Sequence, residues 1–364
     1  MASDRENRIV IIGAGAFGLS TAVGLSKRGY RSITVLDRYP PPAIDGSSVD
    51  ISRVIRNDYA DPVYAHIVRE AMSLWQSKYP EFFHHSGFVL LSSQNSEYLA
   101  GSRKTLQESS HPFEDFNGMA ELKHLFPGFQ GDVSGVSGYM NRVWGWANAA
   151  GAIEALAKEC VVSGVSLITG PRGTAISLQK SGHGQIQGVI TEEGVVPADR
   201  IIFAAGAWTN QLVHMHDAFI ATAQPVGFIQ LTEQEARDLK DAPVMFDFDQ
   251  GFFTFPPTQD THVLKVARHG WGYERPVEVD YSSRGKNIVS SPVMKRSGHT
   301  TTFLPVDAED GLRKGLKKLW LRFADRAWKD TRLCWYCDTP TSDFIIDDHP
   351  DYRGVFVASG GSGQ

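Results

Sequence analysis

The sequence predicts an α/β protein in which a doubly wound domain lies beside a second domain built on an antiparallel sheet. Short apolar runs that end in glycine are typical of buried parallel strands whose carboxyl ends carry turns. Four such runs are RIVIIGAG at 8–15, VSLITG at 165–170, RIIFAAGAW at 200–208 and GVFVASGG at 354–361. Helical patterns lie between them, at 65–79 and 149–164. Strands and helices that alternate in this way favour the doubly wound arrangement.

The second domain is predicted from a change in composition. Segments 80–145 and 215–320 are rich in Phe, Tyr, Gly and Pro, and they contain alternating stretches such as GFFTFPP and HVLKVAR. Such alternation favours antiparallel strands. Because the two compositions interleave along the chain, we expect the doubly wound domain to be discontinuous, formed by 1–79, 146–214 and 321–364.

Composition excludes several classes of partner. The formal net charge is -5, and Lys and Arg are scattered without a basic run, so we expect no nucleic acid partner. No stretch approaches the roughly 18 apolar residues of a membrane span. The N-terminus, MASDRENRIVIIG, lacks the apolar region of a secretory signal. Three cysteines cannot form a disulfide framework, which favours a reducing, intracellular setting.

The first motif is IVIIGAGAFGLSTAVGLSKRGYRSITVLD. Gly13, Gly15 and Gly18 form G-x-G-x-x-G between a predicted strand and a predicted helix, and Asp37 ends the next strand. The glycines permit a tight turn and a close approach of the backbone to a pyrophosphate, and the helix N-terminus offers N–H groups to the phosphates. An acid at Asp37 would accept from a ribose hydroxyl and disfavours a 2'-phosphate. FAD and NAD therefore remain as candidate cofactors.

The second constellation is SSVDISRVIRNDYADPVY at 47–64. Arg53 and Arg56 are three residues apart, so on a helical turn they would share one face. The planar guanidinium group is the preferred partner of a carboxylate because it can bond both oxygens. A solvated basic face would give the same spacing, so both interpretations stay open at this point.

The third candidate is Lys265. On a strand, Lys265 shares a face with Val263 and Ala267, while Leu264 and Val266 point the other way. Apolar neighbours on both faces predict that the lysine is buried, and burying a lysine is costly unless it has a role. Lysines at sheet edges, or with their heads reaching solvent, would show the same pattern.

The segment RLCWYCDTPTSDFIID at 331–346 contains Cys334 and Cys337 in a C-x-x-C spacing. A thioredoxin-like pair should open a helix, but the residues that follow are extended and turn-rich. A zinc site needs two further ligands, and the remaining cysteine, Cys160, is distant in sequence. Two buried apolar cysteines are the interpretation that remains, and no metal site is predicted.

Seven motifs occur in the order and spacing of the monomeric sarcosine oxidase family: VIIGAGAFGLSTAVGLSKRGY, SRVIRNDYADPVY, GWAN, AAGAWTN, GFFTFPP, LKVARHG and LCWYCDTPTSDFIIDDHP. Within that family the chain most resembles the fungal fructosyl amino acid oxidases (amadoriases) and the saccharopine or pipecolate oxidases. The resemblance implies a monomeric protein with an FAD-binding domain and a substrate domain. It also implies oxidation of a secondary amino acid to an imine, with oxygen reduced to hydrogen peroxide. A truncated, inactive paralogue and an NAD-dependent dehydrogenase are the alternatives.

The resemblance also implies roles for individual residues. Cys334, ten residues before Phe344, matches the cysteine that attaches FAD covalently. Arg53 matches the arginine near the flavin ring, Arg56 the one that binds the substrate carboxylate, and Lys265 the lysine that promotes reaction with oxygen. A nearby base such as Arg332 would favour the Cys334 thiolate. The predicted cofactor-binding residues are Gly13, Gly15, Ala16, Phe17, Gly18, Asp37, Arg38, Ser47, Ser52, Arg53, Cys334, Gly361, Ser362 and Gly363.

The sequence departs from the family at its C-terminus. In the family the glycine-rich GGSG precedes an aromatic-lysine motif, whose lysine also contacts the substrate carboxylate, and then a closing helix. Here the sequence ends at Gln364. This predicts either a truncated gene model, splice form or fragment, or the loss of part of the active site. The expected location is cytoplasmic or peroxisomal. The C-terminal tripeptide that addresses proteins to the peroxisome is not present in this sequence.

Overall fold

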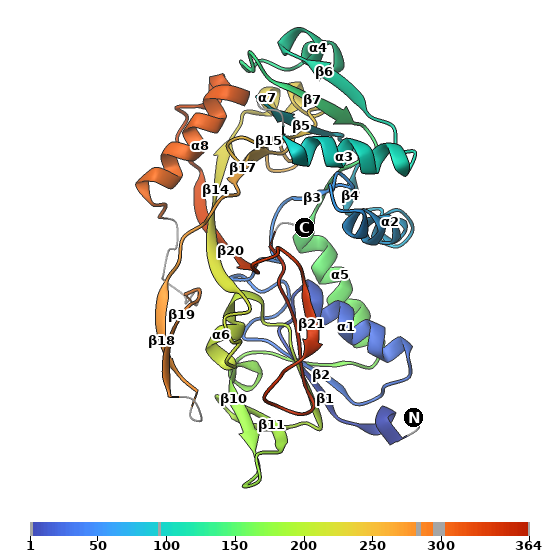
Figure 1. The fold of residues 1–364 in the computed structure, drawn as a ribbon, viewed down its shortest axis with the longest axis vertical. Coiled ribbons are helices and arrows are strands. Elements are labelled where there is room, and N and C mark those ends of the chain that lie inside the picture. The colour runs from blue at the N-terminus through green and yellow to red at the C-terminus, as the bar shows by residue number, and fades with distance from the viewer. Residues whose placement is uncertain (1–2, 94–95, 282–284, 294–302, 363–364) are drawn as a thin grey trace.

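The computed structural model describes residues 3–93, 96–281, 285–293 and 303–362 (Figure 1). The molecule is elongated and has two parts, each built around one large sheet. A six-stranded sheet with helices α1 and α5 lies in the lower part of Figure 1, and an eight-stranded sheet with helix α8 lies in the upper part. No helix in these ranges is both long enough and apolar enough to cross a bilayer.

The lower sheet confirms the predicted doubly wound arrangement. Its strand order is β21-β22-β13-β1-β2-β9, and its neighbours pair in parallel except for β21 with β22. The strands are β1 (Ile9–Ile12), β2 (Ile33–Leu36), β9 (Ser166–Ile168), β13 (Arg200–Phe203), β21 (Ile345–Asp348) and β22 (Val355–Ser359). All four glycine-ended apolar runs are parallel strands of this sheet.

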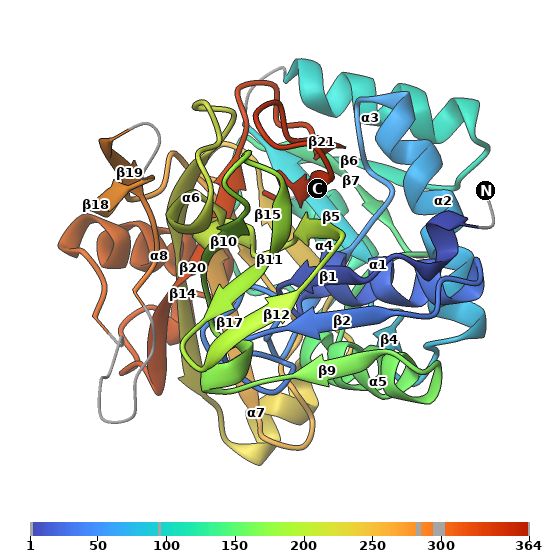
Figure 2. The same ribbon diagram turned by 90° about the horizontal axis from the view of Figure 1, so that it is seen from below.

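Both faces of the six-stranded sheet are covered. Helices α1 (Ala16–Lys27) and α5 (Ala149–Val162) pack on one face against Ile9 and Ile11. The opposite face, with Val10 and Ile12, packs against the antiparallel sheet of β10 (Ala175–Lys180), β11 (Ile186–Thr191) and β12 (Gly194–Pro197). Figure 2 shows the helices and this small sheet on opposite sides of β1 and β2. Burial on both faces explains why β1 is apolar at every position.

The upper sheet confirms the predicted antiparallel strands. Its order is β20-β14-β17-β16-β15-β5-β7-β6, and only β15 and β5 pair in parallel. The strands are β5 (Phe88–Ser92), β6 (Glu114–Asn117), β7 (Ser137–Asn141), β14 (Ile220–Gln230), β15 (Val244–Asp247), β16 (Phe252–Thr254), β17 (Val263–Arg268) and β20 (Asp330–Asp338). Strand β20 pairs with β14 over nine residues, so segment 321–364 contributes to both large sheets.

The remaining elements cover these two sheets. Helix α8 (Val306–Leu319) packs on one face of the eight-stranded sheet, with Leu312 and Leu316 against Leu264. The other elements are α2 (Pro62–Ser77), α3 (Glu97–Glu108), α4 (Met119–Leu125), α6 (Thr209–Leu212), α7 (Glu233–Asp238), β3 (Arg53–Ile55), β4 (Phe83–His84), β8 (Gly145–Ala147), β18 (Pro276–Asp280) and β19 (Lys286–Ser290). The opposite face of the eight-stranded sheet is buried too: Val263, Ala267 and Cys334 pack there, with Ile51 of the segment before β3 against them.

Candidate active site

A cavity of about 1180 Å³ lies between the two sheets. It begins at the carboxyl ends of β1 and β2, where doubly wound folds bind their ligands. It continues past β3 and β20 to a group of aromatic side chains on the upper sheet. The volume exceeds the roughly 300–1,000 Å³ of pockets for drug-sized ligands, so a dinucleotide and a small substrate can share it.

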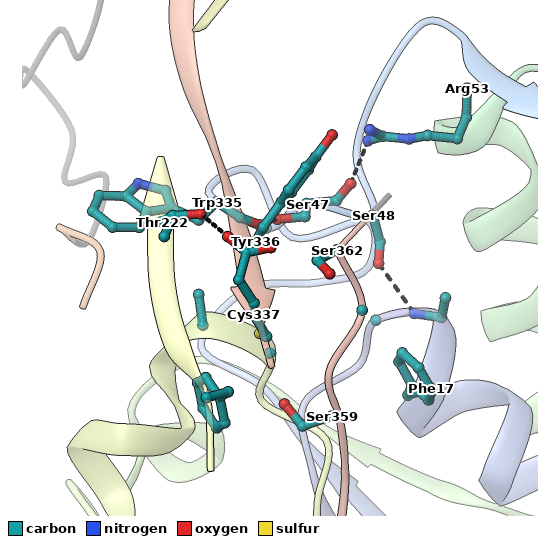
Figure 3. Close-up of a pocket in the computed structure, with 18 of the residues that line it drawn as sticks. Phe17, Ser47, Ser48, Arg53, Thr222, Trp335, Tyr336, Cys337, Ser359 and Ser362 are labelled. Atoms are coloured by element: carbon teal, nitrogen blue, oxygen red, sulfur yellow. Dashed lines mark hydrogen bonds between the residues drawn. The ribbon is translucent and has the colours of Figure 1, made fainter. Parts of the chain in front are cut away.

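The glycine turn has the geometry of a dinucleotide site. Gly13 has a φ of +110°, and a Cβ built on it would lie 2.3 Å from the backbone oxygen of Ala204. A Cβ on Gly18 would lie 1.9 Å from the oxygen of Gly13, so the helix packs directly on the turn. The hydroxyl of Ser48, which the sequence did not suggest, accepts the Ala16 N–H at 3.1 Å (Figure 3). The turn thus needs glycine for both its conformation and its packing.

Asp37 directly follows β2 and lines the cavity. Its Oδ2 accepts the Ala14 N–H at 2.8 Å and its Oδ1 the Tyr39 N–H at 3.2 Å, while burial raises its pKa. Each carboxylate oxygen keeps a further lone pair for a ribose hydroxyl. Beside it, Arg38 stacks over Trp208 at 4.5 Å. Within the described ranges, Arg38 Nε and Trp208 Nε1 are buried without a hydrogen-bond partner, which fits a site for a polar ligand.

Arg53 lies in a strand rather than on a helical turn, so the expected shared helical face is wrong. Strand β3 contains the β-branched residues Val54 and Ile55, which favour strands. Arg53 lines the cavity, and its Nη2 donates to the backbone oxygen of Ser47 at 2.5 Å (Figure 3). The Ser47 hydroxyl in turn donates to the Trp335 oxygen, so the Ser47 loop joins Arg53 to β20.

Arg56 reaches the aromatic end of the cavity. Its guanidinium lies 4.3 Å from the ring centre of Tyr59, and Nη1 donates to Tyr98 Oη at 2.9 Å and to the Asp58 oxygen. The group is held by a cation–π contact, a tyrosine hydroxyl and a backbone oxygen. No ion pair within 4 Å forms with it among the described residues, although the buried Asp58 carboxyl is near enough to favour its charge. The carboxylate of an entering molecule can therefore pair with it.

Lys265 is buried, as the alternation predicted. The residue is 2% exposed, and Nζ donates at 2.6 Å to both Asp50 Oδ2 and the Ser52 oxygen. The Phe255 ring lies 4.5 Å from Nζ. Burial lowers the pKa of Lys265 to about 8, although the Asp50 charge opposes this effect. A lysine with this pKa is still mainly protonated at pH 7.

Asp50 is the residue that the sequence reasoning missed. It is 3% exposed, and its Oδ2 lies 2.6 Å from Lys265 Nζ, 2.7 Å from Arg332 Nη2 and 3.5 Å from Arg53 Nη2. Burial alone would raise the pKa of Asp50, but the three positive charges outweigh it and lower the pKa to about 2. A signal was available, because Asp50 is the single charged residue in 46–52 and stands three residues before Arg53.

The two cysteines of the C-x-x-C spacing point to opposite faces of β20. Cys334 packs with Val226 and Val263, and it lies within hydrogen-bonding reach of the Arg53 guanidinium. Cys337 lies in the other core and lines the cavity, and burial raises its pKa to about 12. Both thiols are free. Opposite faces exclude a disulfide between them, which agrees with the rejection of a redox pair.

Most of the predicted cofactor and substrate residues line the cavity. These are Gly13, Gly15, Ala16, Phe17, Asp37, Arg38, Ser47, Arg53, Arg56, Gly361 and Ser362. The structure does not place Gly18, Ser52, Lys265 or Cys334 in the lining: Gly18 supports the turn, and the others lie behind Arg53. Gly363 lies outside the described residues.

The aromatic end of the cavity was also missed. Its walls are Tyr59, Tyr64, Trp75, Tyr98, Phe246, Phe248, Phe253, His269 and Trp271. Burial lowers the pKa of His269, which favours a neutral ring there. Sequence alternation identified Phe253 as part of a strand but could not say which face meets the cavity. These walls surround Arg56 with apolar surface, which would strengthen its pairing with a carboxylate.

A glycine turn at the switch of a doubly wound sheet, joined to a second chamber that contains an arginine, defines a dinucleotide-binding protein with room for a second, carboxylate-bearing ligand. The chain belongs to the family described as FAD dependent oxidoreductase, whose model matches residues 8–364. The residues around the turn fit FAD, and they offer backbone N–H groups to its pyrophosphate and Asp37 to its ribose.

Three relatives illustrate the match. L-saccharopine oxidase of Schizosaccharomyces pombe is 31% identical over 387 residues, covering 98% of this chain and 86% of that protein. Monomeric sarcosine oxidase of Bacillus sp. (strain NS-129) is 24% identical over 375 residues, covering 98% of this chain and 88% of that protein. The solved structure of Amadoriase I from Aspergillus fumigatus superposes with a TM-score of 0.85 at 29% identity, covering 99% and 83%. These matches confirm the resemblance seen in the sequence.

The glycine turn yields a first prediction. Gly13→Ala should lower the FAD content of the purified protein at least about tenfold, because strain of roughly 1–3 kcal/mol falls on the turn that holds the pyrophosphate. Flavin absorbance per protein measures this. Gly182→Ala is the matched control, since nothing lies within 4 Å of a Cβ there. Full flavin content in Gly13→Ala would contradict the assignment of the turn.

Proposed function

We propose that the protein oxidises the CH–NH bond of a secondary amino acid to an imine and passes the electrons to oxygen, forming hydrogen peroxide. The observation that carries the proposal is Arg56, which lines the aromatic end of the cavity and forms no ion pair among the described residues. The saccharopine, sarcosine and fructosyl amine oxidases among its relatives name substrates of this kind. Nothing in the matches supports an NAD-dependent dehydrogenase.

The residues divide the work between two chambers. Arg56 would pair with the substrate carboxylate and fix the carbon to be oxidised toward the FAD site, so that reaction becomes effectively unimolecular. Bound FAD supplies the acceptor for the two electrons released when the substrate C–H bond breaks. The aromatic walls would exclude water during this step. Water then hydrolyses the released imine, and oxygen takes up two electrons and two protons.

Lys265 would serve the reaction with oxygen. Its ammonium group lies behind Arg53, and a fixed positive charge there would favour the negative charge that develops on oxygen. We further propose that FAD is attached covalently to the Cys334 sulfur, because Cys334 matches the attachment cysteine of the family that the sequence resembles and lies beside Arg53, which lines the cavity. Covalent attachment would also hold the cofactor at a fixed position relative to Lys265.

The remaining expectations accompany this proposal. We expect a monomer in which segments 80–145 and 215–320 form the substrate domain and the other segments bind FAD. A cytoplasmic or peroxisomal location stays a prediction.

A peroxide-release screen tests the proposed function. The purified flavoprotein is offered sarcosine, pipecolate, saccharopine and fructosyl amino acids in air, and peroxide is measured with a coupled dye. We expect peroxide from at least one secondary amine and none from its tertiary or non-carboxylate analogue. Flavin that no member of this panel reduces would reject the proposed reaction.

Arg56→Ala tests the carboxylate site. We expect it to weaken binding of a carboxylate inhibitor by about 1.5–3 kcal/mol, the usual contribution of a hydrogen bond to a charged group. Perturbation of the flavin spectrum measures the affinity. The amide of the same inhibitor should bind both proteins equally, and Arg69→Ala, at an exposed position on α2, should change neither affinity. If Arg56→Ala lost affinity equally for the carboxylate inhibitor and for its amide, the substitution would have disturbed the fold rather than removed a carboxylate partner.

A further inference from the structure

The Lys265 ammonium group depends on a single carboxylate. Among the described residues, Asp50 is the acidic group that pairs with it. The other contacts of Nζ are a backbone oxygen, from Ser52, and the face of Phe255. Neither contact carries a full negative charge, so neither can replace Asp50 in a buried site.

The other charged groups near Lys265 are cationic. Arg53 faces it from β3 and Arg332 from β20, and both oppose its charge. The titratable groups Cys334 and Tyr336 of β20 face Arg53. Without Asp50, burial and two guanidinium groups would together favour the neutral amine.

We propose that Asp50 is a positioning residue for the reaction with oxygen, which fixes the Lys265 amine behind Arg53 and keeps it protonated. The inference rests on the proposed function, since it matters for turnover only if Lys265 acts on oxygen. Asp50 Oδ1 accepts the Ile51 N–H at 2.8 Å, so the carboxylate is itself oriented by the backbone. All of the cations therefore meet one fixed oxygen, Oδ2.

The arrangement keeps positive charge beside the cavity. Three cations meet one carboxylate, which leaves two positive charges in excess. That excess would favour negative charge in the cavity without letting the lysine deprotonate. Arg332 also donates to the Val49 oxygen at 3.0 Å, and it precedes Cys334 by two residues. Asp50 thus joins the lysine to the strand that carries the proposed attachment cysteine.

The pH dependence follows from these charges. The pKa of Lys265 is about 8, so the ammonium form predominates below that pH and is lost above it. In the wild type, reoxidation by oxygen should slow as the pH rises through about 8. In Asp50→Asn, which keeps the shape but not the charge, the pKa of Lys265 falls further. The same slowing should then appear about two pH units lower.

Stopped-flow kinetics across pH test the proposal. At pH 7 we expect Asp50→Asn to reoxidise at least about tenfold more slowly than wild type and to recover as the pH is lowered. Reduction by the amine substrate should change little. Asp50→Glu, which restores the carboxylate, should recover much of the rate. A merely structural defect would slow the reaction without moving its pH profile.

A second readout needs no turnover. Trace acetylation of the purified flavoprotein, with peptides quantified by mass spectrometry, measures the reactivity of each lysine amine. For one lysine compared between two variants in which its accessibility is the same, this reactivity follows the neutral fraction. At pH 7, a pKa lowered by about two units should raise the labelling of Lys265 about tenfold in Asp50→Asn over wild type, relative to the exposed Lys104. Asp247→Asn is the matched control, because Asp247 pairs with Lys318 at 2.7 Å in another buried site. It should leave Lys265 labelling unchanged.

The outcomes distinguish a failure of the proposed role of Asp50 from a failure of the proposed function. Wild-type labelling of Lys265 together with an unmoved pH profile in Asp50→Asn would overturn the role of Asp50. A wild-type protein that forms no peroxide with any amine would instead overturn the proposed function. In that case the labelling still decides whether Asp50 holds the charge on Lys265.

Discussion

Replacing Lys265 with methionine is expected to slow the reaction of the reduced enzyme with oxygen by about 10²–10³-fold, the effect of removing one preorganised charge or donor from an active site. Reduction by substrate should change much less, because only the oxygen reaction builds negative charge outside the flavin. Methionine occupies similar volume, so Phe255 and its neighbours keep their packing. Stopped-flow measurement of each half-reaction separates the two effects.

Lys318→Met is the matched control for Lys265→Met. Lys318 also pairs with a buried aspartate, Asp247, but it lies on α8 and does not line the cavity. Its replacement should reduce stability and leave both half-reactions close to wild type. If Lys265→Met slows both half-reactions equally, or neither, the oxygen-reaction role of Lys265 is wrong.

The sequence pattern predicted those features of the fold that depend on residues close together in the chain, such as the buried strands. The four glycine-ended runs became parallel strands because burial on both faces demands continuous apolar sequence. The alternation around Lys265 placed it correctly between two cores. The same alternation explains the cysteines, since residues three apart in β20 must point to opposite faces.

The features that could not be predicted from the sequence depend on tertiary contacts. Asp50 acquires its importance from Lys265 and Arg332, which are 215 and 282 positions away in the chain. The helical and strand periodicities of a sequence do not indicate contacts between residues so far apart in the chain. The helical spacing of Arg53 and Arg56 failed because β-branched neighbours and pairing of β3 with β8 favoured a strand. The aromatic chamber was missed because its members come from separate segments.

Two properties of the cysteines bear on which of them would attach FAD: access to the cavity and the acidity of the thiol. Cys337 lines the cavity, which favours access to a cofactor. Its thiol is a poor nucleophile, however, because with a pKa of about 12 only about one molecule in 10⁵ is ionised at pH 7. Cys334 lies beside the Arg53 guanidinium, which lines the cavity. The weak acidity of the Cys337 thiol and the ten-residue offset from Cys334 to Phe344 therefore both favour Cys334 as the attachment point.

Cys334→Ser is expected to release essentially all of its flavin into the supernatant on acid precipitation, whereas wild type keeps its flavin in the pellet. A serine hydroxyl is too weak a nucleophile near neutral pH to form the bond. Cys337→Ser, the matched control on the same strand, should keep the flavin in the pellet. Absorbance of pellet and supernatant measures the partition. Both cysteines lie on the tryptic peptide 333–353, so fragmentation of that peptide locates the flavin mass on one sulfur. Flavin mass on Cys337, or acid-resistant flavin in Cys334→Ser, would show that Cys337 is the attachment point.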